Sequence, residues 1–304
     1  MHCVITFELS KKVRGRLGQR SFGYATSPGI VREQNEDSLC IRPDLGLWAV
    51  ADGMGGYKAG DMASRITVEQ LADDVGNRVS LSHAISEVHQ KILNIARTDV
   101  ALESMGSTVV ALKVDGNAYE IAWVGDSRAY LWNGRQLVQL TRDHSYVQSL
   151  IDAGTITEAE AEIHPERHAI TQALGAEGIA AVEVGTINGI FKENDMVLLC
   201  SDGLSNEVGD DEMSSILAQH GSEQMKAEQL IDRAEQNGGA DNISVILVGP
   251  DPAVAAKAID EKPGAPWVNP LVTEGKGRGH QFWIWMVILL LALFLSVMFV
   301  YDII

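Results

Sequence analysis

The stretch Leu47-Trp-Ala-Val-Ala-Asp-Gly-Met-Gly-Gly56 contains five apolar residues, then Asp52, Gly53 and a glycine-rich turn. A second stretch has the same form, because the largely apolar run 196–201 leads into Asp202 and another glycine. A single Asp-Gly pair is typical of an ordinary turn. Two apolar strands that both end in a carboxylate instead indicate a sheet with acidic side chains gathered at one edge.

Strand and helix patterns follow one another on both sides of these two stretches. Asp115-Gly116 and Asn133-Gly134 are typical hairpin turns, so they predict antiparallel pairing. The expected helices come in pairs between groups of strands, which favours an α+β fold over a parallel βαβ fold. The expected strands are 47–51, 106–114, 118–125, 129–132, 196–201 and 243–248, and the expected helices are 59–75, 82–98, 210–219 and 222–236.

Composition divides the 304 residues into four parts. Residues 1–20 carry five basic residues and one acidic residue, which predicts a basic N-terminal extension; a solvated arm is favoured over contact with anionic lipid. Residues 21–249 have a net charge of −20 and are long enough for one domain. Because so acidic a domain repels polyanions, nucleic-acid binding is not expected.

The C-terminal part of the chain predicts a membrane anchor. Residues 250–281 hold five of the eight prolines and are expected to form a Pro/Gly-rich linker. Residues 282–301 are apolar and uncharged, and a helix of this length crosses a hydrocarbon core of about 30 Å. Lys276 and Arg278 precede this transmembrane helix, which places the domain in the cytoplasm. Three widely spaced cysteines agree with reduced thiols in that compartment.

Other acidic residues occupy similar positions at strand ends. Asp126 ends one predicted strand, Asp241 precedes another, and Glu36-Asp37 follows Arg32 in a polar loop. Each acid alone is more typical of a turn. If they converge, however, their charges repel one another unless cations neutralise them, and oxygen ligands are typical of Mg²⁺ or Mn²⁺.

The sequence motifs of several other enzyme classes are absent. It has no Gly-x-x-x-x-Gly-Lys-Ser/Thr loop, no Gly-x-Ser-x-Gly elbow and no His-Glu-x-x-His pair. No cysteine has an arginine six residues further on, which argues against a cysteine-dependent phosphatase. The acidic set is therefore the best candidate site.

Eight short motifs occur in order along the domain: Arg32-x-x-Asn-Glu-Asp-Ser38, Val50-Ala-Asp-Gly-Met-Gly-Gly56, Gly106-Ser-Thr108, Val124-Gly-Asp-Ser-Arg-Ala-Tyr130, Thr141-x-Asp-His-Ser145, Ile170-Thr-Gln-Ala-Leu-Gly175, Cys200-Ser-Asp-Gly-Leu204 and Asp241-Asn-Ile-Ser-Val245. In this order they resemble the motifs of the PP2C (PPM) metal-dependent serine/threonine phosphatases of the bacterial type. The resemblance covers about residues 21–248.

The resemblance implies a four-layer α-β-β-α sandwich of two antiparallel sheets with a binuclear metal site at one edge. By matching positions, Asp52 is expected to bridge two ions and the Gly53 carbonyl to bind one of them. Asp202 and Asp241 are expected to complete the first site, and Glu36 to serve the second through water. Asp126 matches the acidic residue that helps to hold a third ion in bacterial members.

Three further residues receive roles from the same resemblance. Asp37 and Asn242 are expected to orient the metal ligands by hydrogen bonds. Arg32 matches the family's phosphate clamp, because a guanidinium can bond two phosphate oxygens at once. The segment 147–174 resembles the flap beside the bacterial site; as an alternative, it is a long helical hairpin insert.

The expected mechanism needs no protein nucleophile. Water that bridges two divalent ions loses a proton near neutral pH, and the resulting hydroxide can attack phosphorus in line. Asp52 and Arg32 are therefore the expected catalytic residues. Met54 and Tyr57 stand where other members have a histidine acid, so protonation of the leaving oxygen is assigned to metal-bound water or Tyr57. His144 is interpreted as structural.

The resemblance implies Mn²⁺- or Mg²⁺-dependent hydrolysis of phosphoserine and phosphothreonine in proteins. A Hanks-type serine/threonine kinase is the expected opponent, with that kinase or its targets as substrates. Together with residues 282–301, this predicts a single-pass protein of the bacterial inner membrane. The alternative is a catalytically silent, membrane-tethered scaffold that binds phosphoproteins; only the missing histidine acid favours it.

Overall fold

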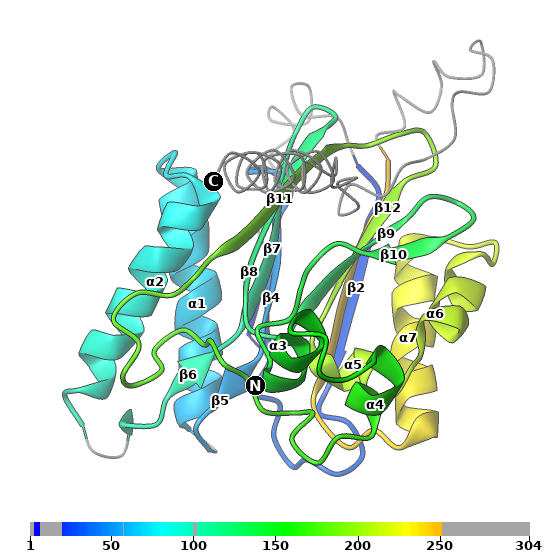
Figure 1. The fold of residues 1–304 in the computed structure, drawn as a ribbon. Coiled ribbons are helices and arrows are strands. Elements are labelled where there is room, and N and C mark those ends of the chain that lie inside the picture. Colours follow the sequence, from blue (N-terminus) through cyan, green and yellow to red (C-terminus); the bar gives the residue numbers. More distant parts are fainter. Residues whose placement is uncertain (1–2, 7–19, 57, 100–101, 251–304) are drawn as a thin grey trace, which may run out of the picture. The chain divides into compact units, whose positions relative to one another are not determined.

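Two β-sheets form the centre of the protein in a computed structural model, which describes residues 3–6, 20–56, 58–99 and 102–250. Figure 1 shows the two sheets side by side. The first has the order β1 (Cys3–Thr6), β3 (Ser38–Arg42), β4 (Leu47–Ala51), β7 (Val109–Asp115), β8 (Ala118–Val124) and β11 (Gly185–Ile190). The second has the order β10 (Leu137–Gln139), β9 (Arg128–Trp132), β12 (Met196–Cys200), β13 (Ile243–Val248) and β2 (Phe22–Ser27).

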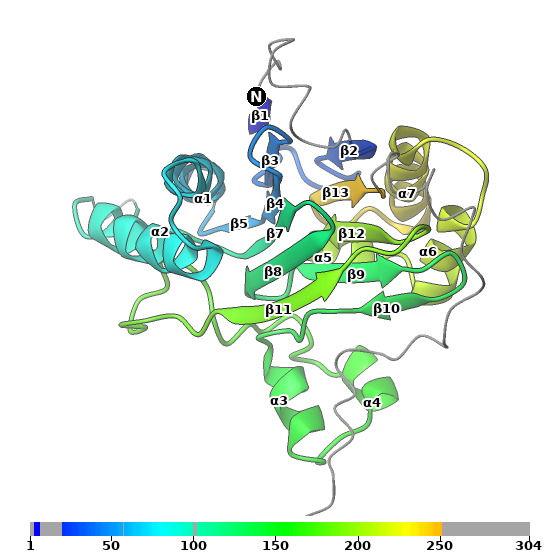
Figure 2. The same ribbon diagram turned by 90° about the horizontal axis from the view of Figure 1, so that it is seen from above.

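Helices cover the outer face of each sheet, so the predicted α-β-β-α layering is confirmed (Figure 2). Helices α1 (Ala59–Gly76) and α2 (Leu81–Ala96) lie against the first sheet. Helices α6 (Asp210–Leu217) and α7 (Glu223–Asn237) lie against the second. All four agree with the sequence predictions to within two residues at each end.

The two faces of each central strand explain why these strands are apolar along their whole length. Leu47, Ala49 and Ala51 belong to the core beneath α1 and α2. Trp48 lies on the other face of β4 and contacts Phe22 of the second sheet, with ring centroids 6.1 Å apart. Every residue of β4 is therefore buried, and the strand lacks the polar alternation of a sheet with one wet face.

The strand pairing is antiparallel throughout, apart from one pair. Strand β1 pairs in parallel with β3 at the edge of the first sheet, with Cys3 opposite Ser38. Part of the predicted N-terminal extension is therefore a strand, and the interpretation of residues 1–20 as a solvated arm is wrong for Cys3–Thr6. A four-residue edge strand has too short a pattern to be recognised from sequence.

Arg20 also belongs to the domain, although the sequence placed it in the extension. Its buried guanidinium donates to the carbonyls of Gly249 at 3.2 Å and Gly116 at 2.7 Å, and it lies over the Phe191 ring at 4.0 Å. It thereby joins the two ends of the domain to the β7–β8 turn. This side chain cannot contact lipid headgroups, so that interpretation is wrong for Arg20.

The flap region consists of two short helices in place of one long hairpin. Helix α3 (Tyr146–Asp152) begins at Ser145, whose hydroxyl accepts the Gln148 amide. Helix α4 (Glu158–Glu162) begins with a capping box between Thr157 and Glu160. Both helices lie beside one end of the sheets (Figures 1 and 2).

The predicted C-terminal parts are not tested by the structure. Apart from Pro250, the linker at 250–281 and the transmembrane helix at 282–301 lie outside the described residues. Within the described ranges, every helix is too short or too polar to cross a membrane. Cys40 and Cys200 are both buried.

Candidate active site

The candidate site lies where strands from both sheets end. Asp52 follows β4, and Asp202 follows β12 as the first residue of α5 (Asp202–Ser205). Figure 1 shows α5 near the same end as the short strands β5 (Gly53–Met54) and β6 (Gly106–Ser107). The carboxylates of Asp52 and Asp202 are within hydrogen-bonding reach of each other, so the two predicted strand-end acids do converge.

The other predicted acids surround Asp52 closely enough to change its ionisation. Burial raises the pKa of Asp52 well above its usual value, and the charges of Asp37, Asp202, Asp126 and Asp241 raise it further. Removing a carboxylate from water and placing it beside like charges both disfavour its charged form. The fold therefore gathers acids from five separate segments of the chain into one electrostatic cluster.

Asp126 and Asp202 show the same effect. Burial, followed by the charges of Asp202 and Asp143, raises the pKa of Asp126 to about 8. Burial and the charge of Asp241 raise the pKa of Asp202, while Asn206 donates to its Oδ2 at 3.0 Å. The charge of His168 in the flap segment also acts on Asp202 and opposes this rise.

Two glycines bring Glu36 against the start of α1. A Cβ atom at Gly53 would lie 2.2 Å from the Gly60 carbonyl oxygen and 2.6 Å from that of Glu36. A Cβ atom at Gly60 would lie 2.5 Å from Glu36 Oε2. Only glycine fits at 53, where the neighbours are backbone atoms, while a side chain at 60 would displace the Glu36 carboxylate. The Gly53 backbone and the Glu36 carboxylate can thus share one narrow space.

The hydroxyl-rich motif 106–108 holds the backbone of Asp52. The Thr108 amide donates to the Asp52 carbonyl at 2.8 Å, and Ser107 Oγ donates to the same oxygen at 3.0 Å. The Asp52 amide donates to Thr108 Oγ1 at 3.2 Å. The motif is visible in the sequence, but no role could be assigned to it there, because the residues alone do not predict which backbone groups it contacts.

Asp37 lies buried beside Asp52 and is only 3% exposed. Its Oδ2 accepts a hydrogen bond from Ser201 Oγ at 2.9 Å, while its Oδ1 has no hydrogen-bond partner within the described residues. Burial raises the pKa of Asp37 to about 7. An unpaired buried oxygen is costly, so Oδ1 is a candidate position for a bound cation or its water.

Asn242 fastens the loop that carries Arg32 and Glu36. Its Oδ1 accepts the Glu36 amide at 2.8 Å, and its Nδ2 donates to the carbonyls of Gln34 at 2.8 Å and Pro28 at 3.1 Å. Asn242 was predicted to orient metal ligands. It orients the backbone of the whole loop 28–36.

Arg32, the predicted phosphate clamp, forms an ion pair with Asp241, a predicted metal ligand. The Arg32 Nη2 to Asp241 Oδ2 distance is 2.8 Å, and both side chains are about half exposed. The charge of Asp241 and the hydrogen bond to it raise the pKa of Arg32. Arg32 therefore lies at the solvent-exposed edge of the acidic cluster.

A second arginine fixes the strand end at Asp126. The partly buried Arg128 donates from Nε and Nη2 to the Asp143 carboxylate, with the shortest contact at 2.7 Å. His144 Nδ1 accepts the Gly125 amide at 3.2 Å, and burial lowers the pKa of His144. A histidine that accepts a backbone amide beside Asp126 agrees with the structural role expected from the sequence.

The site residues fit hard divalent cations by their donor chemistry. The cluster offers carboxylate oxygens with excess negative charge, one unpaired buried oxygen at Asp37 and a narrow glycine-lined space at Gly53. Within the described ranges, however, no group of three or more His, Cys, Asp or Glu side chains is placed to hold a metal ion. Tyr57, the other candidate acid, lies outside the described residues.

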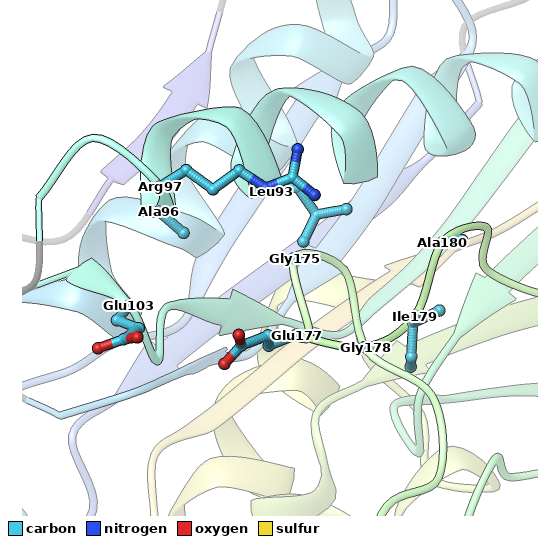
Figure 3. Close-up of a pocket in the computed structure, with 9 residues that line it drawn as sticks. All are labelled: Leu93, Ala96, Arg97, Glu103, Gly175, Glu177, Gly178, Ile179 and Ala180. Atoms are coloured by element: carbon cyan, nitrogen blue, oxygen red, sulfur yellow. The ribbon is translucent and has the colours of Figure 1, made fainter.

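A cavity of about 520 Å³ lies away from this cluster, between the end of α2 and the loop 175–180 (Figure 3). Its wall combines apolar side chains such as Leu93 with Arg97, Glu103 and Glu177. None of the predicted site residues lines it. The chemistry indicated by the carboxylates therefore belongs to the acidic edge of the sheets.

Comparisons with known proteins agree with this site. Residues 32–237 match the family described as Protein phosphatase 2C. The serine/threonine phosphatase stp of Listeria welshimeri is 40% identical over 238 residues, which are 74% of this chain and 94% of that protein. The crystal structure of the Mycobacterium tuberculosis serine/threonine phosphatase PstP/Ppp matches with a TM-score of 0.69 and 35% identity, over 76% of this chain and 99% of that one.

A further structure bears on the cofactor. The catalytic domain of PstP in complex with two manganese ions matches with a TM-score of 0.67 and 33% identity, over 76% of this chain and 97% of that one. This agrees with the predicted Mn²⁺ or Mg²⁺ cofactor. The ligand roles that the resemblance implies for individual residues remain predictions.

Proposed function

We propose, because this chain belongs to the protein phosphatase 2C family of enzymes, that it hydrolyses phosphoserine and phosphothreonine esters in proteins with Mn²⁺ or Mg²⁺ as cofactor. One observation carries the proposal: acidic side chains from four distant segments converge on Asp52, where their charges are not balanced. The charged form of such a cluster is unfavourable unless protons or cations neutralise it.

The ion-holding residues follow from the positions of the predicted ligands. Asp52, with Asp202 and Asp241, would hold one ion, and Asp52 with the Gly53 carbonyl and Glu36 a second. Asp126, at the edge of the cluster, would hold a third. When bound, the ions supply the positive charge that activates a water molecule and stabilises the phosphoryl oxygens.

Side chains of the domain hold the proposed catalytic residues in position. Ser107 and Thr108 fix the Asp52 backbone, and Asn242 fixes the loop that carries Arg32. Arg32 would bind two phosphate oxygens in a paired geometry and hold the ester in line for displacement. Because Arg32 is half exposed and its ion pair with Asp241 lies at the surface, it can turn to a substrate at little cost.

The cellular setting of the enzyme is part of the proposal. The uncharged run at 282–301, with Lys276 and Arg278 before it, supports a single-pass anchor in the bacterial inner membrane with the domain in the cytoplasm. The opposing enzyme would be a Hanks-type serine/threonine kinase. Anchoring raises the local concentration of the phosphatase near membrane-bound kinases and their targets.

The proposal is tested with an aryl phosphate and a phosphothreonine peptide, each with Mn²⁺ and with a chelator. Hydrolysis that requires Mn²⁺ and falls at least about a thousandfold in Asp52→Asn is expected, because charge-stabilising groups contribute on this scale. Asp115→Asn is the matched control, since Asp115 is an exposed residue at the far turn of β7. Binding of the phosphopeptide without turnover would instead favour the silent scaffold.

The anchor is tested separately. The full chain should sediment with inner membranes and resist extraction by carbonate, while a chain that ends at Asp251 should not. Recovery of the full chain in the soluble fraction would contradict the anchor and leave the phosphatase activity untouched.

A further inference from the structure

Two large apolar side chains lie exposed directly beside the candidate active site. Ile30 is 66% exposed and Val31 is 67% exposed. A single exposed apolar residue is ordinary, but here two consecutive apolar residues are both exposed. Arg32, the proposed phosphate-binding residue, is the next residue in the chain.

The backbone holds this pair in place although its side chains face solvent. The amide of Ile30 donates to the Gly239 carbonyl at 2.8 Å, and that of Val31 to the same oxygen at 3.4 Å. A Cβ atom at Gly239 would lie 3.1 Å from Ile30 Cγ1, so the loop packs tightly against the segment that leads to Asp241. The apolar pair is therefore presented in a fixed position beside the site.

The spacing matches an extended peptide. Successive Cα atoms are 3.8 Å apart, so Ile30 and Val31 lie within about 8 Å of the Arg32 backbone along the chain. An extended peptide advances about 3.3 Å per residue. If Arg32 holds the phosphate, a side chain one or two residues from the phosphorylated residue would reach the pair.

The surrounding charge disfavours acidic side chains in the substrate. Glu33 and Glu36 follow Arg32 closely, and Asp241 forms an ion pair with Arg32. A substrate with acidic residues next to the phosphorylated position would meet these carboxylates as well as the apolar pair. An apolar side chain meets neither repulsion nor a loss of hydrogen bonds, and it gains from removing the pair from water.

We propose that Ile30 and Val31 form a specificity surface that binds an apolar side chain located within two residues of the phosphoserine or phosphothreonine of the substrate. This inference rests on the proposed function and adds the class of phosphosite. The occupant is the substrate peptide itself, bound in continuity with the phosphate at Arg32.

The test compares two phosphothreonine peptides that differ only in having leucine or asparagine at the two positions on each side of the phosphothreonine. The measured quantity is the ratio of their kcat/KM values, and an aryl phosphate reports the chemistry of each enzyme. The wild-type enzyme should favour the leucine peptide about fivefold to tenfold, as expected for partial burial of an aliphatic side chain. Ile30→Ser combined with Val31→Ser should bring the ratio close to one.

Ile190 provides the matched control. It is 70% exposed and pairs with Ala118, at the end of β8 opposite to Asp126 and roughly 25 Å away along the strand. Ile190→Ser should therefore keep the wild-type ratio. Val31→Ser alone should give an intermediate ratio, so the test does not depend on the double variant.

A wild-type ratio near one would overturn the proposal, and so would a ratio that the Ile30 and Val31 substitutions leave unchanged. In either case Mn²⁺-dependent hydrolysis of the aryl phosphate would still stand, and the proposed function with it. A wild-type enzyme that hydrolyses neither the aryl phosphate nor the peptides would overturn the proposed function and this proposal together.

Discussion

The guanidinium of Arg32 lies 2.8 Å from the carboxylate of Asp241, across 209 positions of sequence. Arg32 therefore binds a carboxylate oxygen that, in the proposed site, would bind a metal ion. Under that proposal metal and arginine would compete for Asp241, and a bound metal would leave Arg32 available for phosphate.

This competition predicts that Arg32→Ala binds Mn²⁺ more tightly than the wild-type enzyme. An exposed ion pair contributes about 0.2–1 kcal/mol, which corresponds to a factor of about 1.5 to 5 in Kd. Calorimetric titration of the metal-free protein measures this without any turnover. The same variant should lose inhibition by inorganic phosphate. Weaker Mn²⁺ binding by Arg32→Ala would show that Arg32 helps to organise the metal ligands instead of competing with the ion.

Removal of the metal should expose the repulsion among the carboxylates. A ligand at one hundred times its Kd stabilises a protein by about 2.7 kcal/mol, so Mn²⁺ should raise the melting temperature and a chelator should lower it. Asp52→Asn should abolish most of this rise, because Asp52 is at the centre of the cluster. In Asp115→Asn the rise should persist. An equal rise in both variants would mean that the ion binds elsewhere.

Asn242 should be more important for stability than its size suggests. Asn242→Ala removes three part-buried hydrogen bonds to the loop 28–36 and leaves their backbone groups unpaired, so a loss of about 2–4 kcal/mol is expected. Asn133→Ala is the matched control, since Asn133 caps an exposed hairpin turn through the amides of Arg135 and Gln136. Urea denaturation compares the two. Similar losses in both variants would contradict the role assigned to Asn242.

The sequence predicted β4, β7, β8, β9, β12 and β13 because their evidence is local, but it did not predict β2, β3 or β10. The run 47–51 is apolar throughout and ends in Asp-Gly, and β4 has those same bounds. Strand β11 was missed, since Gly185–Ile190 contains two glycines, alternates between half-buried and exposed residues, and makes no apolar run. Strand β1 was not predicted either, because it depends on pairing with β3 and the pattern of residues 3–6 does not reveal that partner.

The carboxylates of the site could be predicted from the sequence, but the residues that hold them in place could not. Aspartates at strand ends can be read from the sequence, and the structure gathers them as expected. By contrast, Asn242 binds the Glu36 amide across 206 positions, and Ser201 binds Asp37 across 164. Such contacts depend on which strands become neighbours, and no local pattern reports that.

Arg20 should stabilise the domain although it lies at its boundary. Arg20→Ala removes the bonds to Gly249 and Gly116 and the contact with Phe191, so a loss of about 2–3 kcal/mol is expected. Arg20→Lys should recover only part of this, because an ammonium cannot reproduce the planar fork. Arg135→Ala, in an exposed turn, is the control. If Arg20→Lys recovered the full stability of the wild type, the positive charge of Arg20 would account for its whole contribution.

His89 should make stability depend on pH. The ring is fully buried; its Nδ1 accepts the Gly175 amide and its Nε2 donates to the Ile179 carbonyl, both at 3.0 Å. Burial lowers the pKa of His89, so the folded protein binds this proton less readily than the unfolded chain. The contribution of His89 is therefore complete above the unfolded pKa of about 6.5 and is lost as the pH falls below it.

His89→Gln isolates this effect from the many titrating carboxylates, since glutamine keeps a donor for Ile179 and cannot gain a proton. The measured quantity is the free energy of unfolding of the wild type minus that of the variant, at pH 7.5 and pH 5.5. This difference should fall by up to about 1.4 kcal/mol over that interval, the value of one pKa unit. A difference that stays constant, or that grows at pH 5.5, would mean that the folded protein binds this proton as readily as the unfolded chain, and that the two hydrogen bonds do not hold the ring in its neutral form.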